Sequence, residues 1–161
     1  MNGIKRILVV DDDAINVDLL LMALSSQHFP HQTVVAHDGA EALDYLFGRG
    51  KFARRDCEQP VVVLLDLKMP VVDGFEVLRQ VKSDEALKRI PVVVFSSSND
   101  QGDMLRCYGL GANAYVIKPV DFSEFREVVQ AVGQFWTGIN QTPTFVACEQ
   151  HEAELLASAT A

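Results

Sequence analysis

Five polar residues that could together carry out phosphoryl transfer follow short apolar runs of this sequence: Asp11, Asp12, Asp66, Ser96 and Lys118. Clustered carboxylates repel one another and raise their own pKa values unless a cation joins them. Mg²⁺ prefers carboxylate, water and phosphate oxygens, so it is the natural occupant of such a cluster. A lysine ammonium and a serine hydroxyl at the same pocket would stabilise charge on a phosphoryl group during its transfer. The carboxylate of Asp66 is then the candidate nucleophile, and its product would be an acyl phosphate.

These residues can meet only if the apolar runs before them lie side by side. The runs are rich in Val, Ile and Leu and show little polar alternation, which is typical of strands buried on both faces of a parallel sheet. We expect five such strands, at Ile7–Val10, Thr33–Ala36, Val61–Leu65, Val92–Phe95 and Ala114–Ile117. Between the runs, apolar residues recur at helical spacing, and the last of these helical stripes continues to Trp136.

The expected helices have clear start signals. At three places an aspartate, which caps free backbone N–H groups, is followed three residues later by a glutamate. These pairs are Asp38 with Glu41, Asp73 with Glu76, and Asp121 with Glu124. Strand and helix therefore alternate five times, which predicts a doubly wound α/β sheet. With strand order 2-1-3-4-5, the first and third strands are neighbours, and Asp11, Asp12 and Asp66 share one pocket at the carboxyl ends of the strands.

Size and charge restrict the classes of protein to consider. The chain has 161 residues, a mass of 17.8 kDa and 48% hydrophobic side chains, which suits one well-packed domain. We assign residues 1–139 to that domain and residues 140–161 to a C-terminal tail without an independent domain. The net charge of −8 gives no drive towards a nucleic-acid backbone. No apolar run approaches the ~20 residues of a membrane span, so we expect no membrane partner.

The cysteines favour a cytoplasmic chain. Cys57, Cys107 and Cys148 are odd in number, widely spaced and without a Cys-x-x-Cys pair. This pattern predicts neither a zinc site nor a disulfide framework, which is typical of proteins of the cytosol.

Each candidate site residue has an ordinary structural explanation when it is taken alone. An aspartate after a strand is usually a helix cap, and Asp13 is best explained in this way. A Lys–Pro pair such as Lys118–Pro119 is usually only a turn. Acidic, hydroxyl and ammonium groups together at the ends of four strands favour a site for phosphoryl chemistry instead.

As an ordered set, these segments resemble the receiver domains of response regulators and are close in layout to the chemotaxis receiver. The matching motifs are Ile7–Asp12, Leu64–Pro70, Asp73–Gly74, Ile90–Ser96 and Gly111–Pro119. The resemblance extends from Ile4 to about Trp136 and implies the flavodoxin-like (βα)₅ fold with strand order 2-1-3-4-5.

The resemblance implies a role for each residue of the acidic pocket. Asp66 would be the phosphoacceptor. Asp11, Asp12 and Asp66, with the backbone carbonyl of Lys68, would bind Mg²⁺. Lys68 and Ser98, two residues beyond Asp66 and Ser96, stand where receiver domains tune the lifetime of the phosphoryl group, and Lys68 places a cation there.

Further roles are implied for residues of the fourth and fifth strands. Ser96 would be the switch hydroxyl that moves towards the phosphoryl group, and Tyr115 would be the aromatic switch that turns inward behind it. Lys118 would pair with the acyl phosphate. The bond between Lys118 and Pro119 is expected to be cis, which is plausible only before a proline.

A narrower resemblance concerns the long connection Phe47–Pro60, the segment Leu87–Pro91 and the terminal Gln134–Trp136. These segments are similar to the single-domain response regulators of microbial phytochromes. Surfaces of the fourth helix, fifth strand and fifth helix pair two subunits in those proteins. The resemblance implies a phytochrome-type partner and a homodimer, with Phe135 and Trp136 as candidates for its interface.

We therefore expect a single-domain response regulator that takes a phosphoryl group from a sensor histidine kinase and signals through protein contacts. It would catalyse only its own phosphotransfer and dephosphorylation. One alternative is a degenerate receiver that acts as an interaction module without phosphorylation. Another is an aspartyl-phosphate phosphohydrolase, but such enzymes usually carry Asp-x-Asp, whereas Asp66 is followed at the second position by Lys68.

Overall fold

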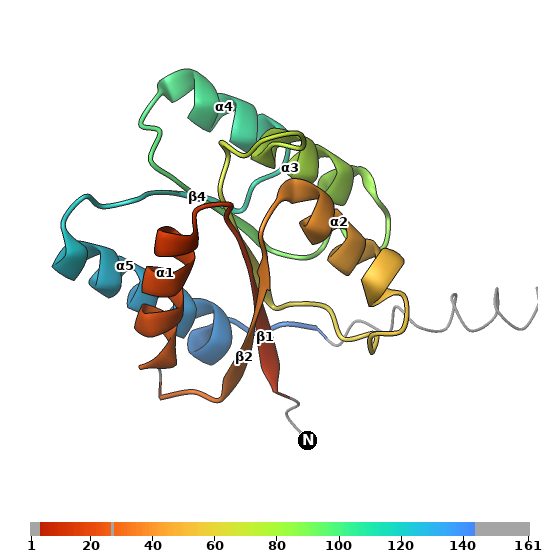
Figure 1. Ribbon diagram of the computed structural model, residues 1–161, viewed down its shortest axis with the longest axis horizontal. Coiled ribbons are helices and arrows are strands. Elements are labelled where there is room, and N and C mark those ends of the chain that lie inside the picture. Colours follow the sequence, from red (N-terminus) through yellow and green to blue (C-terminus); the bar gives the residue numbers. More distant parts are fainter. Residues whose placement is uncertain (1–3, 27, 144–161) are drawn as a thin grey trace, which may run out of the picture.

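The computed structural model describes residues 4–26 and 28–143 (Figure 1). Five parallel strands form one sheet in the order β2-β1-β3-β4-β5, as predicted. The strands are β1 (Lys5–Val10), β2 (His31–Ala36), β3 (Val62–Leu65), β4 (Val92–Ser96) and β5 (Ala114–Ile117). The helices are α1 (Ala14–Ser25), α2 (Gly39–Phe47), α3 (Gly74–Ser83), α4 (Gln101–Gly109) and α5 (Phe122–Gln134).

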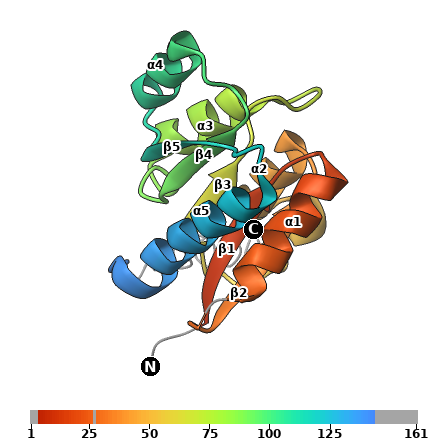
Figure 2. The same ribbon diagram turned by 90° about the vertical axis from the view of Figure 1, so that its left-hand side faces the viewer.

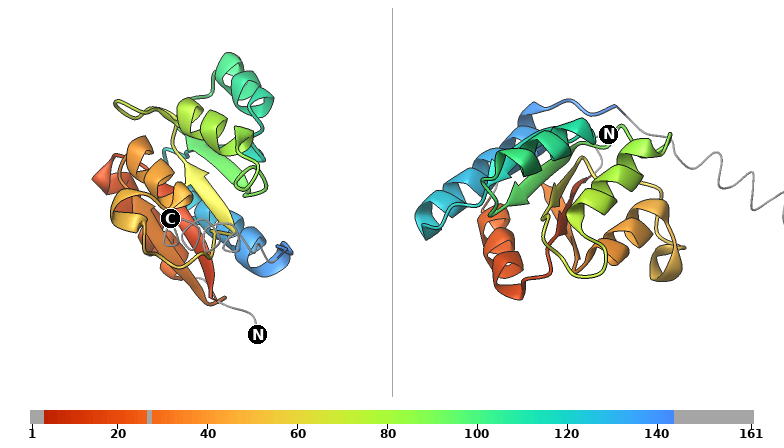
Figure 3. Two further views of the ribbon diagram at one scale, coloured as in Figure 1. Left: turned by 90° about the vertical axis from the view of Figure 1, so that its right-hand side faces the viewer. Right: turned by 90° about the horizontal axis from the view of Figure 1, so that it is seen from above.

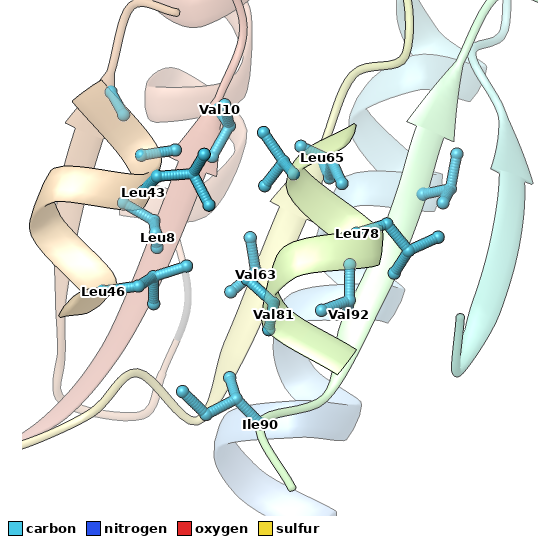
Figure 4. Packing of buried hydrophobic residues seen from close by; sticks show 14 of the residues in the cluster. Leu8, Val10, Leu43, Leu46, Val63, Leu65, Leu78, Val81, Ile90 and Val92 are labelled. Carbon is cyan, nitrogen blue, oxygen red and sulfur yellow. The ribbon is translucent and has the colours of Figure 1, made fainter. Parts of the chain in front are cut away.

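Helices cover both faces of the sheet, because successive residues of each strand point to opposite sides. On one face, α1 and α5 lie side by side (Figure 2). Leu20 and Phe125 of these helices pack with Ile7 and Val9 of β1. On the other face, α2 and α3 cover the sheet (Figure 3, left). There Leu43 and Leu78 pack with the other side chains of the strands (Figure 4). This two-sided burial explains why the strands read as continuous apolar runs.

The predicted helix caps are present. The side chain of Asp38 accepts the N–H of Glu41, and Asp121 accepts the N–H of Glu124 in the same way. Asp13 caps α1 by accepting the N–H of Ile15, as expected. These bonds fix where each helix starts, and therefore the length of the loop that follows each strand.

The apolar stripe of the last helix continues to Trp136 as predicted, but the helix changes its hydrogen-bond pattern before that residue. Regular α5 ends at Gln134, and Phe135–Ile139 form a short π-helix. The hydroxyl of Thr137 donates to the carbonyl of Gly133, and the ammonium of Lys5 donates to the carbonyl of Thr137 at 2.6 Å. The N–H of Asn140 donates to the carbonyl of Phe135, which is the i to i−5 bond of a π-helix, and the bond from Lys5 attaches this turn to the start of β1.

The cysteine prediction is wrong in one respect. Cys57 takes part in a disulfide bond, whereas Cys107 is free and buried in α4. Burial raises the pKa of the Cys107 thiol to about 11. A disulfide depends on how closely the fold brings two Cα atoms together, which the spacing of cysteines along the chain does not show. The argument from cysteines to the cytoplasm is lost with it.

The structure describes the predicted C-terminal tail, residues 140–161, only as far as residue 143. The part of the tail beyond residue 143 lies outside the described residues, so the domain boundary at residue 139 stays a prediction. No helix in the described part of the chain is long and apolar enough to cross a membrane.

The residue at the start of α3 must be glycine for steric reasons. A Cβ atom on Gly74 would lie 2.2 Å from the carbonyl oxygen of Asp66 and 2.7 Å from the Cα of Leu67. The N–H of Gly74 also donates to the carbonyl of Leu67. Helix α3 therefore packs directly against the backbone that carries Asp66.

We expect Gly74→Ala to lower the free energy of unfolding by about 1–3 kcal/mol, because the added methyl group forces backbone to move. Gly109→Ala is the matched control, since a Cβ atom there meets nothing within 4 Å. That variant should be neutral or more stable by up to ~1 kcal/mol, as for a glycine in a helix. Urea unfolding measures both, and equal stability of the two variants would contradict the packing argument.

Candidate functional site

The sheet order brings three carboxylates together. Strands β1 and β3 are neighbours with Val10 opposite Leu65, so Asp11 and Asp66 leave the sheet at the same level. The N–H of Asp66 donates to the carbonyl of Val10, which fixes this register. Carboxylate oxygens of Asp11, Asp12 and Asp66 all lie within 4.8 Å of one another. Sequence reasoning placed these three residues in one pocket, and the structure brings them together there.

The three carboxylates differ in their exposure to solvent. Asp11 is 1% exposed and Asp66 is 9% exposed, whereas Asp12 is exposed at the surface. Burial raises the pKa of Asp66 above its ordinary value; Lys118 opposes this shift, and the neighbouring charge of Asp11 adds to it. A buried carboxylate whose ionised form is destabilised in this way is typical of a functional site.

The ammonium of Lys118 is the positive charge of the pocket. Its Nζ lies 2.7 Å from Oδ2 of Asp11 and 3.3 Å from Oδ1 of Asp66. Strand β5 places this residue beside β4, where the N–H of Lys118 donates to the carbonyl of Ser96. Because the Lys118 side chain is itself largely buried, its charge is poorly screened by water and acts strongly on both aspartates.

The expectation of a cis bond between Lys118 and Pro119 is wrong. No peptide bond among residues 4–26 and 28–143 is cis, so this bond is trans. The trans isomer is the more stable one even before proline, by about 0.5–1 kcal/mol. Since Lys118 reaches both Asp11 and Asp66 with the trans bond, the geometry of the pocket in this structure does not require the cis isomer.

The loop after Asp66 lies close to the pocket, but its positively charged residue, Lys68, faces solvent. The side chain of Lys68 is exposed, and that of Met69 is buried. Val71 follows with a positive φ of 67°, which is unusual for a β-branched residue, and its side chain is fully exposed. A metal-binding role for the backbone carbonyl of Lys68 stays a prediction.

Ser96 and Tyr115 are joined through a residue to which sequence reasoning gave only a tuning position. The oxygen of Ser96 accepts the N–H of Ser98, and the hydroxyl of Tyr115 donates to the carbonyl of Ser98 at 2.9 Å. The hydroxyl of Ser98 donates to Asp103 at 2.6 Å. Asp103 was missed altogether, because an acid three residues after the cap Asp100 resembles an ordinary helix start.

Phe135 and Trp136 lie away from the pocket, on the π-helix after α5. Trp136 packs against the hydrophobic cluster formed with α1 and α5, and Phe135 is 43% exposed. Their rings meet edge to face with centroids 5.0 Å apart. Only Phe135 therefore presents much of its ring to solvent.

Comparison with known proteins identifies the family. Residues 7–130 match the response regulator receiver domain. The chain belongs to this family. It is a receiver of two-component signalling, and the match favours this role over the phosphohydrolase and the degenerate module.

Three similar proteins cover most of the chain. It is 38% identical over 140 residues to the probable methanogenesis regulatory protein FilR2 of Methanothrix harundinacea, covering 85% of this chain and 86% of FilR2. It is 33% identical over 135 residues to the response regulator Rcp1 of Synechocystis, covering 84% and 90%. The structure of the phosphorylated cyanobacterial phytochrome response regulator RcpA aligns with a TM-score of 0.83 at 37% identity, covering 88% of this chain and 100% of RcpA.

The raised pKa of Asp66 has a consequence for stability. Its folded-state pKa lies above its unfolded value, so the ionised carboxylate opposes folding at every pH above the folded pKa. This cost shrinks as the pH falls and is absent below the unfolded pKa. Asp66→Asn should therefore raise the free energy of unfolding at pH 7 by on the order of 1 kcal/mol, while Lys118 keeps its bond to Asp11.

Urea unfolding at neutral pH and at successively lower pH tests this. Asp18→Asn, which removes an exposed acid of α1, is the control and should change stability by less than about 0.5 kcal/mol. A variant Asp66→Asn that is no more stable than the natural protein at pH 7 would disprove the argument.

Proposed function

We propose that Asp66 is the phosphoacceptor of this receiver. Its buried carboxylate, 3.3 Å from the ammonium of Lys118 and beside Asp11 and Asp12, is the observation that carries the proposal. A carboxylate oxygen of Asp66 would attack phosphorus while the bond from phosphorus to the nitrogen of a kinase histidine breaks. The ammonium of Lys118 is placed to neutralise charge on the arriving oxygens.

The donor set of the pocket fits Mg²⁺. Three carboxylates within 4.8 Å of one another, one of them exposed to water, are the hard oxygen ligands that this ion prefers. We propose Asp11, Asp12 and Asp66, with the carbonyl of Lys68, as its ligands. A structure of Rcp1 in its Mn²⁺-bound form, aligned with a TM-score of 0.82 at 32% identity, supports a divalent ion here. When bound, the ion supplies charge neutralisation for the phosphoryl oxygens.

Ser96 and Tyr115 are proposed to report the state of Asp66. The hydroxyl of Ser96 would donate to a phosphoryl oxygen, and Tyr115 would occupy the inward position behind it. The observed contacts support this, because Ser96 is fully buried and Tyr115 packs against the core with its hydroxyl bonded to Ser98. Phosphorylation would then change the populations of two arrangements of the surface formed by α4 and β5.

The partner that we propose is a phytochrome-type sensor histidine kinase. The support is that RcpA is a phytochrome response regulator and that this chain covers all of RcpA at 37% identity. A cytoplasmic location follows from this partner, because histidine kinases take their phosphoryl groups from cytoplasmic ATP. Beyond its own phosphotransfer and dephosphorylation, no reaction is proposed for the chain.

We also propose a homodimer formed through α4, β5 and α5. Four apolar side chains of this face are exposed: Leu105, Tyr108, Ile117 and Phe122. Phe135 is the better of the two predicted interface residues, because Trp136 packs against the hydrophobic core. An exposed apolar face of this kind is typical of an interaction surface.

The phosphoacceptor is tested by labelling with acetyl phosphate and Mg²⁺. The natural protein should gain one phosphoryl group, and Asp66→Asn should gain none, because the amide cannot form the mixed anhydride. Asp18→Asn, with the same chemical change on α1, should be labelled as the natural protein is. Labelling of Asp66→Asn at the natural rate would place the phosphoacceptor elsewhere.

The same assay identifies the class of kinase. A panel of histidine kinases loaded with labelled phosphate should include a phytochrome-type kinase, and that kinase should transfer phosphate to this chain fastest. Faster transfer from kinases of other sensor classes would reject the proposed partner while leaving Asp66 as phosphoacceptor.

The dimer is tested by sedimentation at high protein concentration, with and without a phosphoryl analogue. Phe135→Ala should weaken dimer formation about tenfold, as expected for a buried aromatic anchor of an interface. Met22→Ala, which removes an exposed apolar side chain on α1, should leave it unchanged. A natural protein that remains monomeric in both states would reject the dimer.

A further inference from the structure

Ser98 is a junction between the phosphoryl site and two other elements. Its N–H donates to the Ser96 oxygen at 3.1 Å, and its carbonyl accepts the Tyr115 hydroxyl at 2.9 Å. Its own hydroxyl donates to Oδ2 of Asp103 at 2.6 Å. All three polar groups of this residue, which is only 8% exposed, are therefore engaged at once. Ser98 is thus bonded to both Ser96 and Tyr115 and links them to α4.

The Ser98 hydroxyl also accepts the N–H of Asp100 at 3.3 Å, and of the four contacts the bond to Asp103 is the strongest. Its acceptor is a carboxylate, and a hydrogen bond to a charged acceptor is shorter and about twice as strong as a neutral one. Asp103 is itself fixed, because its N–H donates to the cap residue Asp100 at 3.0 Å. One turn later, Cys107 is fully buried and holds α4 against the core. Asp103 therefore ties Ser98, in the loop between β4 and α4, to helix α4. The helix itself is held at its cap Asp100 and at the buried Cys107.

We propose that Asp103 is a positioning residue for the phosphoryl chemistry of this receiver. Through Ser98, it holds the loop between β4 and α4 in the arrangement in which Ser96 and Tyr115 are both engaged. This role runs through Ser98 and assigns Asp103 no contact with the phosphoryl group or the metal. The inference rests on the phosphoacceptor role proposed for Asp66 and adds a residue of α4 that regulates the same site.

The energetic consequence follows from a two-state argument. A ligand binds most tightly when the arrangement it requires is already populated in the free protein. Without the Asp103 carboxylate, the hydroxyl of Ser98 loses its strong acceptor, and the loop gains freedom that a phosphoryl group must then remove. Binding of a phosphoryl group or its analogue should weaken, and Tyr115 should spend more time away from the Ser98 carbonyl.

The test measures the affinity of the full chain for beryllium fluoride, a phosphoryl analogue, in the presence of Mg²⁺. Asp103→Ala should weaken this affinity about tenfold, which corresponds to the loss of one charge-assisted hydrogen bond. Glu124→Ala is the matched control, because Glu124 holds the same position after the cap Asp121 of α5 and is exposed. The control should bind the analogue as the natural protein does.

A second readout separates positioning from general loss of structure. The chain has three tyrosines, so fluorotyrosine labelling gives three ¹⁹F resonances, and Tyr115→Phe identifies the one of interest. In Asp103→Ala without the analogue, the Tyr115 resonance should move towards that of the exposed Tyr108. The resonance of the buried Tyr45 should stay in place.

Two more variants keep the inference open to disproof if Asp103→Ala does not fold. Asp103→Asn retains an acceptor oxygen and should bind the analogue with an affinity between those of Asp103→Ala and the natural protein. Ser98→Ala removes the same bond from the other side, together with the longer bond from the N–H of Asp100, and its effect should be less than additive with that of Asp103→Ala in the double variant.

The outcomes distinguish this inference from the proposed function. If the natural protein accepts no phosphoryl group on Asp66, the proposed function fails, and this inference fails with it. If the natural protein is phosphorylated but Asp103→Ala, Asp103→Asn and Ser98→Ala all bind the analogue as it does, only the positioning role of Asp103 is overturned. Strictly additive effects of Ser98→Ala and Asp103→Ala would overturn it as well.

Discussion

The structure of the site depends on one balance of charge, in which the ammonium of Lys118 offsets two buried carboxylates. Asp11 and Asp66 are close enough to repel each other, and burial makes that repulsion costly. Lys118 lies within 3.3 Å of both and reduces this cost without removing it, because the pKa of Asp66 remains raised. The pocket is therefore left with unsatisfied negative charge, which a divalent cation can bind.

This balance exists only because of the order of the strands. Asp11 and Asp66 directly follow the neighbouring strands β1 and β3, and Lys118 directly follows the edge strand β5, beyond β4. The long, buried side chain of Lys118 crosses the end of β4 to reach the two aspartates. A change in strand order would separate these charges, and the loops that carry them would then have no common point of contact. The apolar strands thus position polar groups that they do not contain.

The same edge of the sheet joins chemistry to a protein surface. Ser96 ends β4, Tyr115 lies on β5, and Asp103 lies on α4, yet one residue of the intervening loop is bonded to all three. These hydrogen bonds join Ser96, the proposed switch residue, to α4 and β5, which carry exposed apolar side chains. Transmission along these bonds needs an element with two discrete arrangements, and the loop between β4 and α4 is the natural candidate.

Much of the fold could be predicted because its signals are local. Apolar runs of strand length, aspartate caps and helical spacing each depend on neighbouring residues, so the five strands and the order of the elements follow from the sequence. Strand ends were less well defined: β2 begins at His31, two residues before the predicted start. Its early residues are polar because an edge strand is only partly buried, and an apolar pattern does not detect them.

The sequence by itself determined which residue types end the strands, and hence that Asp11, Asp12, Asp66 and Lys118 would share one pocket. Tertiary structure alone decided the trans bond before Pro119, the disulfide at Cys57 and the bond between Ser98 and Asp103. Each of these depends on distances between groups that local sequence patterns do not encode. They become defined only when the packed layers of helix and sheet fix where every loop begins and ends.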